Sequence, residues 1–275
     1  MLALTTKRVL PGFGLSLGGS VLFVCLLLPL SALVMQLAQM SWSQYWEVIT
    51  GPELLAAYKI TLICAGVASL FNAVFGMLMA WILTRYRFPG QTLLDGLMDL
   101  PFALPTAVAG LTLATLFSTT GWYGGWLAQF GIKVSYTWLS IAVAMAFTSI
   151  PFVIHTVQPV LEELGPEYEE AAQTLGAGHW QTFRRVILPE VAPALLAGTA
   201  LSFTRSLGEF GAVIFIAGNI AWKTEVTSLM IFIRLQEFDY PAASAIASVI
   251  LAASLLLLFA INVLQSRFGR RLGGQ

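Results

Sequence analysis

Long apolar stretches, separated by short polar segments, run through most of the chain. A helix that crosses the hydrocarbon core of a membrane needs about 20 consecutive, mostly apolar residues. Stretches of this kind occur at Leu15–Leu37, Tyr58–Leu83, Leu97–Phe117, Thr137–Val157, Ala194–Ala217 and Ala242–Leu264. The pattern predicts an all-α, polytopic membrane protein with six transmembrane helices. No linker or low-complexity tract separates a second domain, so we expect residues 1–275 to form one transmembrane domain.

The composition supports a membrane protein and excludes several other classes. Hydrophobic residues make up 57% of the chain and charged residues 10%, whereas a soluble domain carries about 25% charged residues. The 14 basic and 14 acidic residues cancel, so we expect contact with membrane lipid and no nucleic-acid partner. Cys25 and Cys64 lie in apolar runs without a Cys or His at ligand spacing, so we expect neither a disulfide nor a metal site.

The first apolar stretch follows Lys7 and Arg8, which is also how a secretory signal peptide begins. The apolar part of a signal peptide is only about 7–15 residues long and ends at a small-residue cleavage site. This stretch is longer and no A-x-A site follows it. We interpret it as a retained first membrane helix.

Basic residues set the expected orientation, because Lys and Arg are enriched in the cytoplasmic loops of membrane proteins. If the N-terminus is cytoplasmic, nine basic residues lie inside: Lys7, Arg8, Arg85, Arg87, Arg184, Arg185, Arg267, Arg270 and Arg271. Four then lie outside: Lys59, Lys133, Lys223 and Arg234. We therefore expect both termini in the cytoplasm.

A polar segment, residues 158–193, separates the fourth and fifth apolar stretches on the expected cytoplasmic side. Pro166 suits the first position of a helix, because its missing N–H needs no partner there. Three glutamates follow at the positive end of the helix dipole: Glu167, Glu169 and Glu170. Gly176 stands where a helix ends with a positive φ. The segment therefore predicts a short helix before Gly176.

A second short amphipathic helix is predicted from Trp180, Phe183 and Ile187, and Pro189 is expected to interrupt it before the fifth span. The apolar positions of the first helix form one stripe at helical spacing: Tyr168, Ala171, Ala172 and Leu175. Small alanine side chains suit a helix laid into a groove of a partner protein. A helix lying on the membrane surface has the same pattern, and the spacing alone favours neither.

The same segment resembles the "EAA" loop of bacterial binding-protein-dependent ABC importer permeases. The resemblance rests on Glu170-Ala171-Ala172, on Gly176, and on Val186-Ile187-Leu188-Pro189, in which Val186 replaces the family's usual isoleucine. It implies a type I ABC importer transmembrane domain with its core at about residues 55–265. It also implies a coupling loop at about residues 158–193 that docks ATP-binding subunits. The implied docking residues are Glu170, Ala171, Ala172, Gly176, Leu188 and Pro189.

Three further segments are similar to the permeases of sulfate and thiosulfate importers: Arg85–Gly90, Leu100–Leu111 and Arg205–Ala212. Relatives for molybdate share versions of the last two, so import of molybdate or tungstate stays open as an alternative. The resemblance implies translocation by alternating access. It also implies three kinds of partner: a second permease subunit of the W type in a heterodimer, two ATP-binding subunits, and a periplasmic sulfate- or thiosulfate-binding protein.

The chain lacks the phosphate-binding loop G-x-x-x-x-G-K-[ST]. We therefore expect it to be a transport subunit without enzymatic activity and without a bound cofactor. The resemblance implies that ATP and Mg²⁺ bind to the partner subunits instead.

Arg205 and Glu209 are the charged residues within the fifth apolar stretch. A lone charge at mid-membrane is costly, and the spacing of four residues places both side chains on one helix face. One reading is a structural ion pair that holds the span. The other is a cationic Arg205 that lines the path of an oxyanion.

The remaining prolines, aspartates, histidines and small residues of the spans have mainly structural interpretations. Pro101 and Pro105 should bend the third span, either to line a path or for packing alone. We expect Asp95 and Asp99 to be solvated carboxylates at the start of that span. His155 and His179 are expected at helix ends or on the surface, and not as a ligand pair. A row of small residues in the last span predicts a close-packed face: Ser244, Ser248 and Ala252.

Two other classes of function, a secondary transporter and a membrane-embedded enzyme, fit the sequence less well than an importer permease. A secondary transporter needs intramembrane titratable groups or ion sites, and the pair formed by Arg205 and Glu209 is too sparse for a proton relay. A membrane-embedded enzyme needs a nucleophile and base or a set of metal ligands within the spans, and the sequence offers none.

Overall fold

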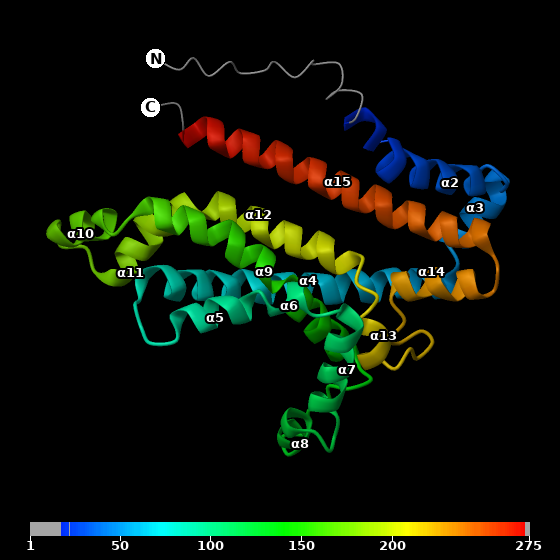
Figure 1. Cartoon of the computed structure of the whole chain (residues 1–275), viewed down its shortest axis with the longest axis horizontal. Helices are drawn as coiled ribbons and strands as arrows, with labels where there is room; N and C mark the ends of the chain where they lie inside the picture. Colours follow the sequence, from blue (N-terminus) through cyan, green and yellow to red (C-terminus); the bar gives the residue numbers. More distant parts are fainter. Residues whose placement is uncertain (1–17, 22, 273–275) are drawn as a thin grey trace, which may run out of the picture.

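The computed structural model of the chain describes residues 18–21 and 23–272, and this part is built from helices and connecting turns without a strand. Leu15, Lys7 and Arg8 lie outside the described residues. Three long helices form the centre of the molecule: α4 (Pro52–Arg85), α9 (Trp138–Leu164) and α12 (Leu188–Leu207). Figure 1 shows them side by side, with α15 (Tyr240–Leu272) next to α12 on one side and α2 (Leu28–Leu37) beyond it against α15.

The remaining helices are short. They are η1 (Phe23–Leu27), α3 (Trp42–Ile49), α5 (Gln91–Met98), α6 (Leu100–Ala103), α7 (Thr106–Phe117), α8 (Trp122–Ala128), α10 (Glu167–Thr174), α11 (His179–Thr182), η2 (Phe183–Ile187), α13 (Val213–Ile216) and α14 (Thr227–Gln236).

Five helices among the described residues are long and apolar enough to cross a membrane: Gly18–Leu37, Pro52–Arg85, Trp138–Leu164, His179–Leu207 and Tyr240–Ile261. They correspond to the first, second, fourth, fifth and sixth predicted stretches. The predicted count of six transmembrane helices is therefore not confirmed exactly, because the third stretch does not form one long helix.

The third predicted span, Leu97–Phe117, is divided among α5, α6 and α7. Leu104 adopts an extended backbone and Pro105 follows it as the cap of α7. This break has a direct cause, since proline disfavours the helical conformation of the residue before it and donates no hydrogen bond. The predicted bend is thus a full break, while Pro101 lies in the first turn of α6. Figure 1 shows α7 turning away from the direction of α5.

The fifth predicted span has different ends from those expected. Helical structure starts at His179 and continues to Leu207, and α13 follows as a separate short helix. Pro189 does not interrupt the helix, so that prediction is wrong. The π turn η2 lies directly before α12, which places Pro189 in the first turn of α12, where its missing N–H needs no partner.

Close packing of α4, α9 and α12 depends on small residues. A Cβ added to Gly198 of α12 would lie 2.9 Å from the Cα of Val153 in α9. A Cβ added to Gly76 of α4 would lie 2.8 Å from the Cβ of the same valine. Small residues let membrane helices approach closely and gain van der Waals contact. Val153 is therefore held between two glycines, one from each neighbouring helix.

A buried polar cluster joins the same three helices at one level. The side-chain nitrogen of Asn72 in α4 lies within hydrogen-bonding distance of Ala146 O (3.0 Å), Ser149 Oγ (2.9 Å) and Ser202 Oγ (3.1 Å), and its two N–H groups are shared among these three acceptors. Buried polar groups require such partners, because an unpaired group loses its bonds to water without compensation. Asn72 precedes Arg85, the end of α4, by 13 residues, which corresponds to about 20 Å at 1.5 Å per residue. Ser202 in α12 therefore lies well inside the bundle.

Candidate coupling site and intramembrane site

The predicted coupling helices lie together at one end of the molecule. Figure 1 shows α10 and α11 beyond the ends of α4 and α9. As predicted, three glutamates occupy the first turn of α10, where the helix dipole favours negative charge. Pro166 is the N-cap residue of α10, one position before the expected one.

Gly176 has the backbone conformation that its position predicted, with φ at +83°. Its N–H bonds to Gln173 O (2.9 Å), and the N–H of Ala177 bonds to Ala172 O (3.0 Å). These bonds satisfy carbonyl groups that the end of α10 would otherwise leave free. No heavy atom lies within 4 Å of a Cβ added to Gly176. The positive φ favours glycine at this position, whereas the space around it within the chain would accommodate a side chain.

The expected apolar stripe of α10 faces largely away from the rest of the chain. Leu175 is 89% exposed and Tyr168 is 54% exposed, whereas Ala172 is buried. Glu170 and Ala171 are also exposed. This surface of α10 is therefore available to another protein.

Arg85, the last residue of α4, connects α10 to the bundle. Its Nε lies 2.6 Å from Glu169 Oε1, and its Nη1 and Nη2 donate to Leu161 O (2.9 Å) and Gly165 O (3.3 Å). In the sequence, Arg85 contributed only to the orientation and to the family resemblance, so its contact with Glu169 was not predicted. A basic residue ending one span and an acidic first turn at the same membrane surface were the available indications.

Aromatic side chains make a second connection between the coupling region and α4. The rings of Trp81 and Phe183 meet edge to face with centroids 5.6 Å apart, and Trp180 stacks on Phe183 at 5.6 Å. Ile187 is buried below them, while Leu188 is half-buried and Pro189 is exposed. The start of the fifth span is thus packed against α4.

The structure brings Arg205 and Glu209 together, with Nη1 and Oε2 2.8 Å apart. The two side chains differ in exposure, at 34% for arginine and 1% for glutamate. Glu209 lies beyond the end of α12, and its Oε1 accepts a hydrogen bond from the N–H of Ala212 (3.0 Å) at the start of α13. Its backbone O accepts from Ser228 Oγ (2.6 Å). Glu209 therefore holds a turn in place as well as an arginine.

The chain has two helix breaks that meet next to this ion pair: one lies between α6 and α7, and the other is the turn between α12 and α13. A Cβ added to Gly211 would lie 2.1 Å from Thr106 Oγ1, and one added to Gly110 would lie 2.3 Å from Ala212 O. The break between α6 and α7 thus contacts the turn between α12 and α13. Discontinuous helices that meet inside a membrane line the substrate sites of many transporters.

Asp99 and His155 form another pair, with Oδ1 and Nε2 2.5 Å apart and side chains 51% and 46% exposed. Asp99 therefore pairs with a histidine, and the expected solvated state describes it only in part. His155 is on the surface, as predicted, but lies inside α9 and not at a helix end. His179 is exposed at the start of α11. No group of three or more His, Cys, Asp or Glu that could hold a metal was found among the described residues.

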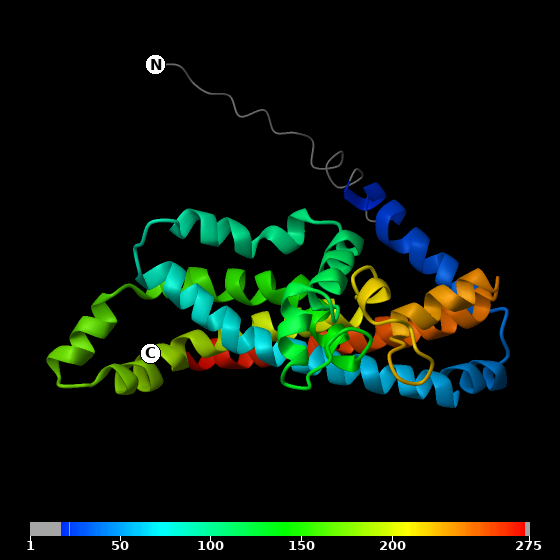
Figure 2. The same cartoon turned by 90° about the horizontal axis from the view of Figure 1, so that it is seen from below.

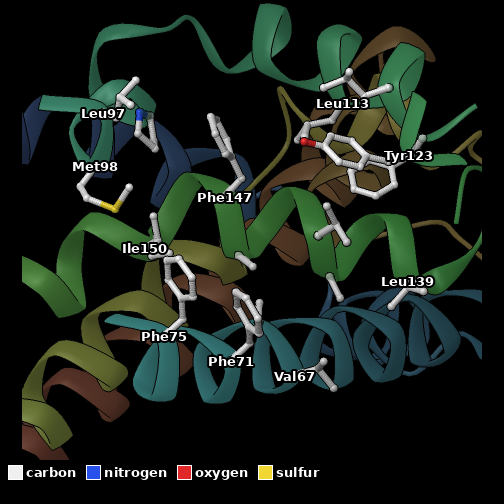
Figure 3. A pocket seen from close by; sticks show the side chains of 17 residues that line it. Val67, Phe71, Phe75, Leu97, Met98, Leu113, Tyr123, Leu139, Phe147 and Ile150 are labelled. Atoms are coloured by element: carbon white, nitrogen blue, oxygen red, sulfur yellow. The ribbon is translucent and has the colours of Figure 1, made fainter. Parts of the chain in front are cut away.

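An apolar cavity of about 550 Å³ lies between α4, α9 and the segment α5–α8. Figure 3 shows aromatic and aliphatic side chains from these elements pointing toward one another: Val67, Phe71, Phe75, Leu97, Met98, Leu113, Tyr123, Leu139, Phe147 and Ile150. No charged side chain lines it, and an oxyanion needs charged or hydrogen-bonding partners. This cavity is therefore not a site for an oxyanion.

Comparisons with known proteins identify the class to which this fold and loop belong. Residues 72–274 match the family described as binding-protein-dependent transport system inner membrane component. The chain belongs to this family and is a membrane permease, a transport subunit. Membership implies ATP-binding and periplasmic binding-protein partners.

Individual relatives are much more similar than the family as a whole. The sulfate transport system permease protein CysT of Escherichia coli (strain K12) is 82% identical over 276 residues, with 100% of both chains covered. The protein of the same name from Salmonella typhimurium is 81% identical over the same coverage. The one from Synechocystis sp. is 48% identical, covering 91% of this chain and 87% of the relative.

Solved structures agree with the type I ABC importer fold. A chain of a bacterial alginate ABC transporter, in complex with an alginate pentasaccharide-bound periplasmic protein, superposes with a TM-score of 0.74 and 20% identity, covering 93% of both chains. A chain of an inward-facing methionine ABC transporter gives a TM-score of 0.60 and 17% identity, covering 83% of this chain and 99% of that one. The fold prediction is confirmed in its class.

Proposed function

We propose that this chain is a permease subunit of an ATP-driven importer that moves sulfate and thiosulfate across the bacterial inner membrane. The observation that carries the proposal is the 82% identity, over its full length, to a sulfate transport system permease protein. Such similarity extends over the whole chain, including every segment that crosses the membrane. Import of molybdate or tungstate is the second candidate, because molybdate importers resemble this chain in the segments around the two helix breaks.

ATP-binding subunits drive the transport, and the coupling loop at about residues 158–193 receives their movement. The exposed stripe of α10 supports this role, since small and apolar side chains face away from the chain. The docking residues are Glu170, Ala171, Ala172, Gly176, Leu188 and Pro189. ATP and Mg²⁺ belong to the partner subunits, and this chain binds no cofactor. The loop lies in the cytoplasm, as do both termini.

The partners are a second, W-type permease subunit in a heterodimer, two ATP-binding subunits, and a periplasmic sulfate- or thiosulfate-binding protein. Residues 1–275 form one transmembrane domain with its transport core at about 55–265.

The oxyanion passes the region where the two helix breaks meet. Arg205 is the cation of the ion pair next to this region, and its side chain is 34% exposed although its partner Glu209 is buried. Close approach of Thr106 to Gly211 brings the start of α7 to the same place. A helix N-terminus offers free N–H groups, which favour a negative ligand.

Uptake of labelled oxyanions tests the proposed substrate. Cells that lack this gene should regain uptake of sulfate and thiosulfate when the intact chain is returned, and should not gain uptake of molybdate. Recovery of molybdate uptake alone would assign the second candidate. Absence of uptake for every oxyanion would contradict an import function.

Gly176→Asp tests the coupling loop in the same cells, with Gly90→Asp as the matched control. Both glycines have a positive φ, +83° and +92°, and neither has a heavy atom within 4 Å of an added Cβ. The backbone cost of about 1 kcal/mol or more is therefore similar for the two. We expect Gly176→Asp to stay in the membrane, to retain less ATP-binding subunit and to lose uptake, whereas Gly90→Asp keeps uptake. Equal uptake by both variants would remove Gly176 from the docking surface.

A further inference from the structure

Arg85 binds three elements that meet at the cytoplasmic end of the bundle. It ends α4, pairs with Glu169 in the first turn of α10, and donates to two carbonyl groups at the end of α9. Those carbonyls, of Leu161 and Gly165, belong to the group that a helix C-terminus leaves without intrahelical partners. A cation is favoured at that end of a helix and an anion at the start of the next. One guanidinium therefore satisfies both helix ends at the junction.

The junction that Arg85 spans has the features of a hinge. The chain passes from α9 to α10 through Gly165, whose φ is +62°, and Pro166. Among the eight described residues of α10, Ala172 alone is buried, so apolar packing fixes this helix only weakly. The side chains of Arg85 and Glu169 are 12% and 23% exposed, and such a partly buried pair is screened less than a surface pair.

Trp81 supports the arginine from α4. The guanidinium carbon of Arg85 lies 5.6 Å from the centre of the Trp81 ring, a distance at which a cation is attracted to the ring face. Trp81 also meets Phe183, which belongs to the second half of the coupling region. The arginine is thus held in one orientation by the same ring that packs the start of the fifth span.

We propose that Arg85 is a positioning residue for energy coupling, which locks α10 to α4 and α9 so that movement of the ATP-binding subunits reaches the transmembrane helices. The inference rests on the proposed function, because it assumes that α10 receives that movement. Without the lock, α10 turns about Gly165 and Pro166 while the bundle stays still. The ATP-binding subunits then hydrolyse ATP with little transport.

The complete transporter in proteoliposomes, with its binding protein and ATP-binding subunits, tests the coupling. Uptake of sulfate per ATP hydrolysed should fall by about tenfold in Arg85→Gln and in Glu169→Gln, a size typical of coupling between sites. Arg85→Lys should be intermediate, because a point charge cannot bind a carboxylate and two carbonyls as a planar fork does. The double variant should be no worse than either single variant, since both break one interaction.

Arg87→Gln is the matched control, because Arg87 is exposed two residues further along the chain and its loss removes the same charge. It should keep the wild-type ratio of uptake to hydrolysis. Equal ratios for Arg85→Gln and Arg87→Gln would overturn the proposal. So would an Arg85→Gln variant that is less abundant but fully coupled, because that outcome assigns a purely structural role.

A readout that does not depend on the substrate separates this inference from the proposed function. A spin label at Gln173, an exposed position of α10, reports how firmly the helix is held. In a background with Cys25 and Cys64 replaced by alanine, Arg85→Gln should raise the mobility of the label and Arg87→Gln should not. Unchanged mobility overturns the lock. If Arg85→Gln raises the mobility of the label while the wild-type transporter imports no sulfate, the lock stands and only the proposed substrate is rejected.

Discussion

The ion pair inside the membrane is asymmetric at the level of single residues. Glu209 is almost fully buried and also accepts a hydrogen bond from the N–H of Ala212. Arg205 keeps 34% of its side chain exposed and has Glu209 as its ion partner. Loss of the arginine leaves a buried carboxylate without its countercharge, which costs more than the pair gains. The pair therefore stabilises the turn after α12 mainly through the glutamate.

Charge-removing variants distinguish a structural pair from a group that contacts the anion. We expect Arg205→Gln and Glu209→Gln each to lower membrane abundance, since breaking a fully buried pair costs about 3–5 kcal/mol. The cost here should be smaller, because Arg205 is partly exposed. The double variant should recover both abundance and uptake, because no charge is left unpaired and the glutamine oxygen still accepts from Ala212. Immunoblots of membranes and uptake of labelled sulfate measure the two effects. Normal abundance with lost uptake in Arg205→Gln, unchanged in the double variant, would instead assign Arg205 to the anion path.

The spacing of four residues was sufficient to predict that Arg205 and Glu209 meet, but not how. The prediction assumed that one helix continues through both residues, whereas α12 ends at Leu207 and Glu209 lies in the following turn. Gly208 and Gly211 flank this turn, and a run of apolar residues hides the break because lipid-facing and buried positions look alike. The contact of Gly211 with Thr106 comes from a distant part of the chain, so local pattern could not reveal it.

At the scale of helices, contact between α9 and α12 depends on the absence of a side chain at Gly198. A Cβ there would lie 2.9 Å from Val153 Cα and 3.1 Å from Phe152 O. Both are backbone atoms, which cannot move aside as the end of a flexible side chain can. The two helices would have to separate, and the hydrogen bonds from Asn72 to Ser149 and Ser202 would lengthen with them.

Gly198→Leu should therefore lower stability by about 3 kcal/mol, the upper range for overpacking. Gly66→Leu in α4 is the control, because no heavy atom lies within 4 Å of a Cβ added to Gly66. Thermal unfolding of the purified proteins in detergent should show a lower midpoint for Gly198→Leu only. Equal midpoints would mean that the packing of α9 against α12 tolerates a large side chain.

Prolines were the least predictable feature at this scale. The same residue type produced a break at Pro105 and no interruption at Pro189. The difference lies in the residues before each proline, which are extended at Leu104 and form a π turn at Phe183–Ile187. A chain can accommodate a proline by breaking the helix before it, or by a π turn that leaves the proline in a first helical turn, where no N–H is needed. Sequence pattern reports the missing donor but not which solution the tertiary packing selects.

At the scale of the whole molecule, the coupling helices and the end of the last long helix lie at the same end. Figure 1 places α10, α11 and the end of α15 at the same end of the molecule. Both termini share one side only if the number of crossings is even. The proposed cytoplasmic location of both termini therefore requires one crossing besides the five long helices, and the segment at the third predicted span is α5, α6 and α7. The chain was predicted to cross six times from apolar length, and the broken third segment explains why five continuous helices are found.

Reporter fusions test this arrangement. Fusions after Gly178 and after Arg271 should give cytoplasmic signals, and fusions near Ile132 and Lys223 should give periplasmic ones, because positively charged loops stay in the cytoplasm. Reporters that require export and reporters that require retention should give opposite activities at each position. A periplasmic signal at Gly178 would invert the topology and separate the coupling loop from any cytoplasmic ATPase.

The π turn before Pro189 has a consequence for how such chains are compared and how they diverge. A π turn is equivalent to an α-helix that has accepted one inserted residue. Deleting one residue within Phe183–Ile187 would restore regular winding and rotate α11 by about 100° relative to α12. With Phe183 retained, Trp180 and Phe183 would turn together away from Trp81 of α4, while the membrane-embedded part of α12 kept its position. When related sequences are aligned, differences in length are usually assigned to loops. Here a gap of one residue belongs inside a helix, and it would change the face of α11 that is offered to the ATP-binding subunit.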